Sequence, residues 1–175
     1  MNRRTAIRNV VVITAGASLL PSCLHTDKPT ITLKNIPLTG SQENMIAGLT
    51  ETIIPRTNAF IGAADLRAHE FVLTMVDDCM PPEEQQKFTT GMKDFETVCR
   101  QQWNNSFTEC SPQQRKELLQ RLEQKQEVPE NAVYFYETTK RYTVQSFTSS
   151  KQYMLDIRKY KMVPGNNYKG CVAVN

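Results

Sequence analysis

His69 and Glu70 are adjacent in the sequence, and both residue types can bind metal ions. His69-Glu70 resembles the opening of a zinc-protease helix, in which a second histidine follows the first by four residues. Position 73 is a leucine, so the second ligand is absent. We therefore expect His69 to lie on a helix surface or to support neighbouring groups rather than to bind zinc.

Other catalytic patterns are missing from the sequence. There is no Gly-rich phosphate loop, no Gly-x-Ser-x-Gly elbow and no Cys-x-x-Cys-His haem site. The adjacent pairs Asp77-Asp78 and Glu83-Glu84 would point about 100° apart on a helix, so they do not face each other as acid and base, and we expect solvated charge. The sequence predicts no catalytic residue and no metal site. An independent enzyme that uses His69 and Glu70 is the alternative, but it lacks further ligands or partners.

The five cysteines fall into two groups. Leu20-Pro21-Ser22-Cys23 resembles a bacterial lipoprotein cleavage site, where the Cys23 thiol takes a diacylglycerol and the acyl chains anchor the protein. The other four have no Cys-x-x-Cys spacing, which speaks against a zinc ribbon or a thioredoxin-like motif. In an oxidising compartment they can pair in three ways, or they can stay as four free, partly buried thiols. They are Cys79, Cys99, Cys110 and Cys171.

Residues 1–22 predict a removable export signal. Three arginines and no acid precede a mostly apolar stretch over residues 10–20, which is far shorter than the roughly 20 residues of a membrane-spanning helix. The adjacent Arg3 and Arg4 resemble a twin-arginine signal, which exports folded cargo, although Ala6 stands where a larger apolar residue is usual. An ordinary signal for unfolded chains is the alternative. We expect the mature protein to be lipid-anchored to a bacterial membrane, facing the periplasm.

Removal of this signal changes the charge of the chain. The whole chain has a formal net charge of +3, and residues 1–22 hold three arginines, so the mature protein is formally neutral. A protein that binds nucleic acid needs a cationic surface to neutralise phosphates. We therefore expect no nucleic-acid partner.

The remainder predicts an all-α protein. We expect a lipidated tether over residues 23–38 and then a single small domain, residues 39–175, of about six helices with an irregular C-terminal tail. We predict where each helix begins and ends from capping residues and prolines. The expected helix starts lie at Thr39 or Ser41, Asp65, Pro81-Pro82, Ser111-Pro112, Pro129-Glu130 and Ser149 or Ser150, and Pro55 and Asn104-Asn105 end two of the helices.

The predicted helix from Glu130 to about Phe147 is aromatic on more than one face. A surface helix usually has one apolar stripe. Burial on two sides, either in the core or against a partner, explains the pattern, and both alternatives stay open. Val133, Tyr136, Val144 and Phe147 share one face, whereas Tyr134, Phe135 and Tyr142 lie off it.

Three segments resemble one protein family. The first is residues 49–57, followed by Gly62-Ala63 and Asp77-Asp78-Cys79; the second is residues 147–150; the third is residues 160–165, leading to Gly170-Cys171-Val172. Together they resemble the small subunit (subunit 3) family of gluconate 2-dehydrogenase, in its lipoprotein form. The chain departs from the family pattern at residues 58–61 and at Ser150.

The resemblance implies a subunit without chemistry of its own. Such a subunit accompanies a large flavoprotein subunit, which binds FAD and oxidises a sugar or sugar acid, and a c-type cytochrome often takes the electrons. The small subunit commonly carries the export signal for both. The resemblance also implies a disulfide between Cys79 and Cys171. We expect the partner to contact Tyr134, Phe135 and Tyr142 and the turn at Pro164 and Gly165. A self-sufficient periplasmic binding lipoprotein without an enzyme partner is the alternative.

Overall fold

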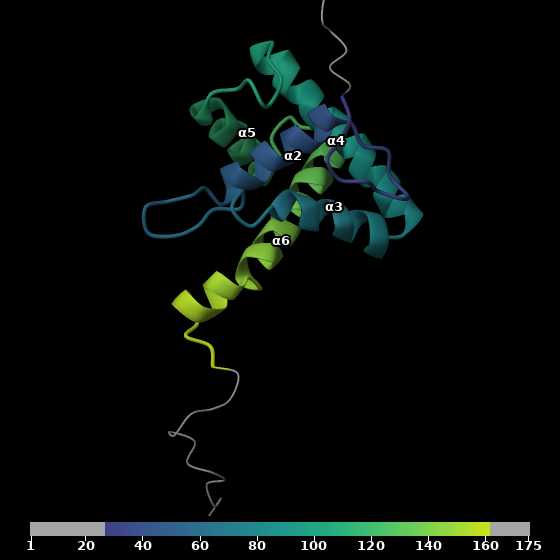
Figure 1. Ribbon diagram of the computed structural model, residues 1–175. Coiled ribbons are helices and arrows are strands. Elements are labelled where there is room, and N and C mark those ends of the chain that lie inside the picture. Colours follow the sequence, from purple (N-terminus) through teal and green to yellow (C-terminus); the bar gives the residue numbers. More distant parts are fainter. Residues whose placement is uncertain (1–26, 162–175) are drawn as a thin grey trace, which may run out of the picture.

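The computed structural model describes residues 27–161. Every regular element in this range is a helix, so the predicted all-α class is confirmed (Figure 1). Arg3, Arg4, Cys23, Pro164, Gly165 and Cys171 lie outside the described residues. The elements are α2 (Gly40–Ile53), α3 (Ala68–Cys79), α4 (Pro82–Trp103), α5 (Pro112–Gln124), α6 (Glu130–Thr148) and the π-helical turn η1 (Tyr153–Ile157).

Local sequence signals set most helix ends. Thr39 caps α2 with a capping box: its hydroxyl accepts from the Gln42 N–H at 3.3 Å, and the Gln42 side chain accepts from the Thr39 N–H at 3.0 Å. Ser111 caps α5 in the same way. Asn104 ends α4 in a left-handed conformation, with φ 55°. These predicted caps are confirmed. None of the helices in residues 27–161 is both long and apolar enough to cross a membrane.

One predicted helix start differs from the structure, and one predicted helix differs in type. Asp65 does not cap α3, which begins after Arg67 without a side-chain cap. The Asp65 carboxylate instead accepts from the Gly62 N–H at 2.9 Å and pairs with Arg56 at 3.0 Å, which closes the preceding loop. The short last helix is mainly the η1 turn, at whose start the Ser150 hydroxyl accepts from the Tyr153 N–H at 3.2 Å.

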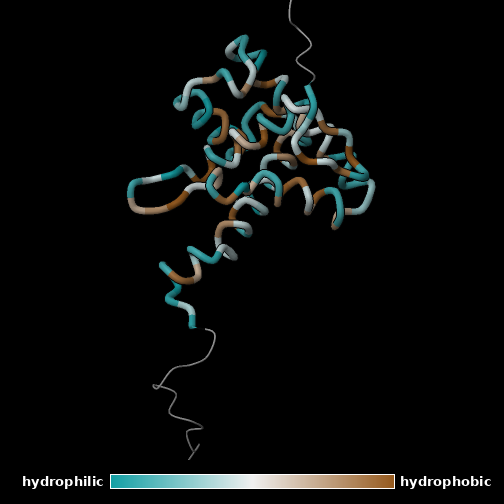
Figure 2. Tube along the Cα trace, in the orientation of Figure 1, coloured by the Kyte–Doolittle hydropathy of each residue, from teal (hydrophilic) through white to brown (hydrophobic). Residues whose placement is uncertain are grey.

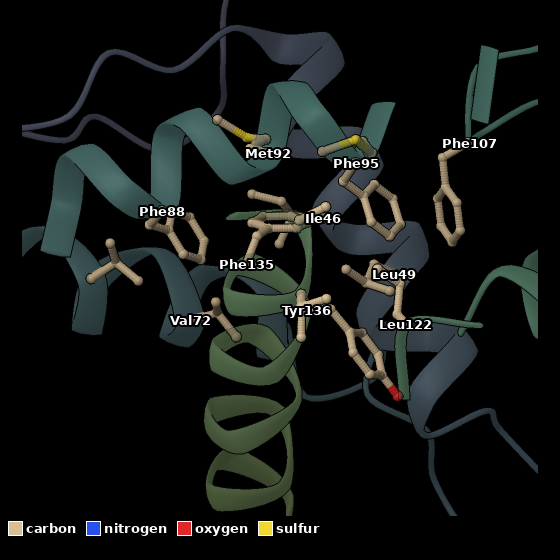
Figure 3. Packing of buried hydrophobic residues seen from close by; sticks show 14 of the residues in the cluster. Ile46, Leu49, Val72, Phe88, Met92, Phe95, Phe107, Leu122, Phe135 and Tyr136 are labelled. Carbon is tan, nitrogen blue, oxygen red and sulfur yellow. The ribbon is translucent and has the colours of Figure 1, made fainter. Parts of the chain in front are cut away.

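Helix α6 runs through the middle of the fold and packs against α2, α3, α4 and α5 (Figure 1). Its fully buried Phe135 lies between two rings of α4, with centroids 4.9 Å from Phe88 and 5.3 Å from Phe95. Figure 3 shows these rings under α4, with Phe107 beside Phe95. Of the two explanations for this aromatic helix, burial in the core is therefore confirmed for its buried part.

The crossing of α4 and α6 requires a glycine. A Cβ added at Gly91 would lie 2.0 Å from the carbonyl oxygen of Asn131 and 2.8 Å from the Cβ of Phe135. No side chain fits into that space without a shift of the backbone. Gly91 therefore sets how closely the two helices approach.

The described part of the predicted tether, residues 27–38, is docked on the domain. It has no regular helix, but its apolar side chains pack on the core. Thr30 donates its backbone N–H and its hydroxyl to Glu43, and Asp27 accepts from the N–H of Ser41 at 2.6 Å. This part of the predicted tether is therefore packed on the domain and not free of it. The packed side chains are Ile31, Leu33, Ile36 and Leu38.

Asp77 holds this segment most firmly. It is 3% exposed, and its carboxylate accepts the backbone N–H groups of Lys34, Asn35 and Ile36 at 2.7, 2.8 and 2.9 Å. Burial by itself would raise the pKa of Asp77, but these three N–H groups and the charge of Lys34 outweigh it, so the pKa lies below its usual value of 3.8. The expectation of solvated charge is therefore wrong for Asp77.

We predict that Asp77→Asn destabilises the protein and frees residues 34–36 from the domain. The amide keeps one acceptor oxygen but loses the charge that three N–H groups share, so the free energy of unfolding should fall by about 1–3 kcal/mol. Urea unfolding and hydrogen exchange at residues 34–36 measure both effects. Because the folded pKa is depressed, the stabilisation by Asp77 is present above the unfolded pKa and is lost as the pH falls through the folded value.

Asp78→Asn is the matched control. Asp78 is exposed and pairs with Lys34 at 3.3 Å, and such surface pairs contribute at most about 1 kcal/mol. Equal losses in the two variants, or unchanged exchange at residues 34–36 in Asp77→Asn, would contradict the role of Asp77.

Candidate partner interface

The exposed large hydrophobic side chains of the described chain gather at one end. Val144 is 42% exposed, Leu155 48%, Ile157 51% and Tyr160 51%. We call residues 144–160 the C-terminal arm. It projects beyond the other helices and carries hydrophobic positions (Figures 1 and 2). Apolar groups concentrated on a projecting surface are typical of a protein interaction site.

Aromatic packing holds the arm in its direction. The Phe147 ring packs edge-on against Phe60 at 5.5 Å and against Tyr153 at 5.6 Å. Phe60 comes from the loop between α2 and α3, so this loop supports the base of the arm. The arm is therefore positioned by the domain before any partner binds, which lowers the entropy cost of association.

The predicted interface residues are not together on the surface. Phe135 is fully buried and Tyr142 is 8% exposed, with its ring edge-on to Phe71 at 6.4 Å. Both are core side chains, so the expectation that they contact a partner is wrong for them. Tyr134 is partly exposed, with the Lys87 ammonium 4.7 Å above its ring. Pro164 and Gly165 lie outside the described residues and stay a prediction.

Helical periodicity could identify two of the arm residues but not their exposure. Val144 and Phe147 share the predicted apolar face with Val133 and Tyr136, and the latter two are buried. The end of α6 extends beyond the other helices, and the residues of that face that lie beyond this point remain exposed. Leu155 and Ile157 lie in a turn too short for a periodic pattern to assign their exposure.

His69 belongs to a polar cluster with Glu43 and Glu70. Its Nε2 lies 3.8 Å from a Glu43 oxygen and 4.0 Å from a Glu70 oxygen, and the three side chains can place one ligand atom each within 4.8 Å of the others. In residues 27–161 this is the group of three such side chains that lie close enough together to hold a metal ion. Sequence spacing did not reveal Glu43, because it lies on a different helix.

The carboxylates of this cluster have protein partners. Glu43 accepts from Thr30, and Glu70 pairs with Arg67. Burial lowers the pKa of His69 below its ordinary value of 6.5, and Arg67 lowers it further, although Glu70 and Glu43 act in the opposite direction. The cluster lies where residues 27–38, α2 and α3 meet.

We predict that the His69 pKa, followed by NMR of its ring protons, lies below 6.5. Arg67→Gln should raise it, because it removes a positive charge, and Glu70→Gln should lower it, because it removes a negative one. His69→Asn assigns the resonance by its loss. A pKa above 6.5 in the native chain, or shifts of the opposite sign in the variants, would contradict this account of the cluster.

Comparisons with known proteins add a family. The family model described as gluconate 2-dehydrogenase subunit 3 matches residues 40–165, which is more than half of the chain. The match begins with α2 and includes the whole C-terminal arm. Curated proteins and solved structures gave no match.

Proposed function

Because the chain belongs to the gluconate 2-dehydrogenase subunit 3 family, we propose that it is a non-catalytic accessory subunit of an exported, FAD-dependent sugar or sugar-acid dehydrogenase. In this proposal the large flavoprotein subunit binds the FAD and oxidises the substrate, and a c-type cytochrome subunit accepts the electrons. The small subunit supports the export, membrane tethering and stability of the large one. It is a component of the oxidoreductase complex and contributes no reacting group.

The C-terminal arm is the observation that carries this proposal. Its exposed apolar side chains lie inside the region that matches the family, and α6 connects the arm directly to the core. The buried centre of a protein interface is more apolar than the surrounding surface, and exposed apolar side chains of this kind can supply it. We infer that Leu155, Ile157 and Tyr160 contact the flavoprotein subunit.

The export part of the proposal rests on the sequence outside the described residues. Arg3 and Arg4 would direct export, and the lipid on Cys23 would hold the complex at the membrane. The docked residues 27–38 leave only a short stretch between Cys23 and the domain. Such a short connection would keep the domain close to the lipid surface.

We predict that the tagged protein, purified gently from the membranes of its own organism, brings down a yellow subunit with the absorption spectrum of FAD. Leu155→Glu with Ile157→Glu should weaken this association at least tenfold, because two carboxylates would be desolvated at the contact. Flavin absorbance per tagged chain measures the association.

Gln113→Glu with Gln120→Glu is the matched control, since it adds the same charge on exposed positions of α5. It should recover the flavoprotein as well as the native chain does. Recovery of the native chain without a flavoprotein would overturn the proposed function. Equal recovery of the flavoprotein with both double variants would show that the arm is not part of the interface.

We predict that Arg3→Lys with Arg4→Lys stops export of both subunits. The twin-arginine signal depends on the arginine pair, whereas an ordinary export signal needs only positive charge. Cell fractionation with antibodies to each subunit measures the effect. Undisturbed export of both subunits would show that this signal does not carry folded cargo.

A further inference from the structure

Two cysteines far from the C-terminal arm lie side by side in the interior. Cys99, in the last turns of α4, is fully buried, and Cys110 is 4% exposed. Each thiol affects the pKa of the other, so the two side chains are close neighbours. Neither residue belongs to the candidate interface or to the cluster around His69.

The chain after α4 folds back to bring them together. Asn104 reverses the direction at the end of α4, and the Phe107 ring then packs on Phe95 with centroids 5.0 Å apart. The Phe107 N–H also donates a hydrogen bond to the Glu96 carboxylate, with 3.3 Å between nitrogen and oxygen. The returning segment therefore runs along the side of α4 that contains Phe95, Glu96 and Cys99.

A tight turn completes the approach. The N–H of Cys110 donates to the carbonyl oxygens of Ser106, at 3.1 Å, and Phe107, at 3.3 Å. Cys110 follows Phe107 by one turn, as Cys99 follows Phe95 by one helical turn. The Phe95–Phe107 contact thus brings Cys110 to the face of α4 that contains Cys99.

Helix geometry excludes a bond from either of these two residues to Cys79. Cys79 is exposed at the end of α3, only three residues before α4 begins at Pro82. Cys99 lies about 25 Å further along α4, at 1.5 Å per residue. A disulfide needs Cα atoms about 4.4–6.8 Å apart, so Cys79 cannot reach Cys99 or its neighbour Cys110.

We propose that Cys99 and Cys110 form a disulfide in the exported protein. Each thiol loses a proton, the sulfur atoms bond, and two electrons pass to a disulfide-bearing oxidant, such as an exported thiol–disulfide oxidoreductase or oxidised glutathione, which is reduced to two thiols. The inference rests on the proposed function only for the oxidising compartment. Among the three ways to pair four cysteines, this bond leaves Cys79 with Cys171.

The bond forms before the segment from Asn104 to Cys110 has packed against α4. The thiolate is the species that attacks a disulfide, and burial raises the pKa of Cys99 to about 12 and also raises that of Cys110. In the closed domain both groups therefore stay protonated and shielded from an oxidant. Once formed, the bond ties the returning segment, and with it the start of α5, to the end of α4.

The test is to refold the mature chain in a buffer of reduced and oxidised glutathione, alkylate it in denaturant, and map the peptides by mass spectrometry. We expect a linked pair of peptides that contain Cys99 and Cys110, lighter by two hydrogen atoms than the reduced pair. Reduction should lower the melting temperature by about 10 °C. Cys79→Ser should leave both results unchanged, and Cys99→Ala with Cys110→Ala should abolish this effect of reduction.

Alkylation of Cys99 and Cys110 after refolding, or a link from either to Cys79, would overturn the proposal. Refolding needs neither export nor a partner, so this outcome would leave the proposed subunit function untouched. The same map of protein isolated from membranes extends the test to the cell. Alkylated Cys99 and Cys110 in that sample would overturn the presence of the bond in the exported protein.

Discussion

The close crossing of α4 and α6 at Gly91 is the contact on which the rest of the structure depends. Because no Cβ separates α4 from the Asn131 carbonyl, Phe135 enters between Phe88 and Phe95, and the core forms around that stack. The position of α6 then decides what remains uncovered. Its first part is enclosed by four helices, while its end and η1 extend past them as the C-terminal arm.

Signals that act within a few residues could be predicted from the sequence. The caps at Thr39 and Ser111 satisfy backbone N–H groups three residues away, so their residue types alone identify them. Asp65 has the same residue type but bonds to Gly62, because closure of the loop competes for its carboxylate. The choice between two local partners depends on tertiary packing, which a capping pattern does not contain.

Contacts across long separations could not be predicted. Asp77 binds N–H groups 41 to 43 residues away, and Glu43 meets Thr30 and His69 only after three segments have packed together. A buried carboxylate and a solvated one have the same letter in the sequence. For the candidate interface, the aromatic pattern of α6 indicated burial on several sides but did not distinguish core neighbours from a partner.

The buried cysteines and the proposed export route constrain each other. A twin-arginine signal moves a folded domain out of a reducing compartment, and in the folded domain Cys99 and Cys110 are protonated and covered. Oxidation after folded export therefore requires the segment after Asn104 to open. That segment is held by Phe107 and by Arg115, which donates to the Phe107 carbonyl at 3.1 Å, and its opening does not require α4 and α6 to separate. Folded export and a disulfide at this position are thus compatible only if the segment opens locally.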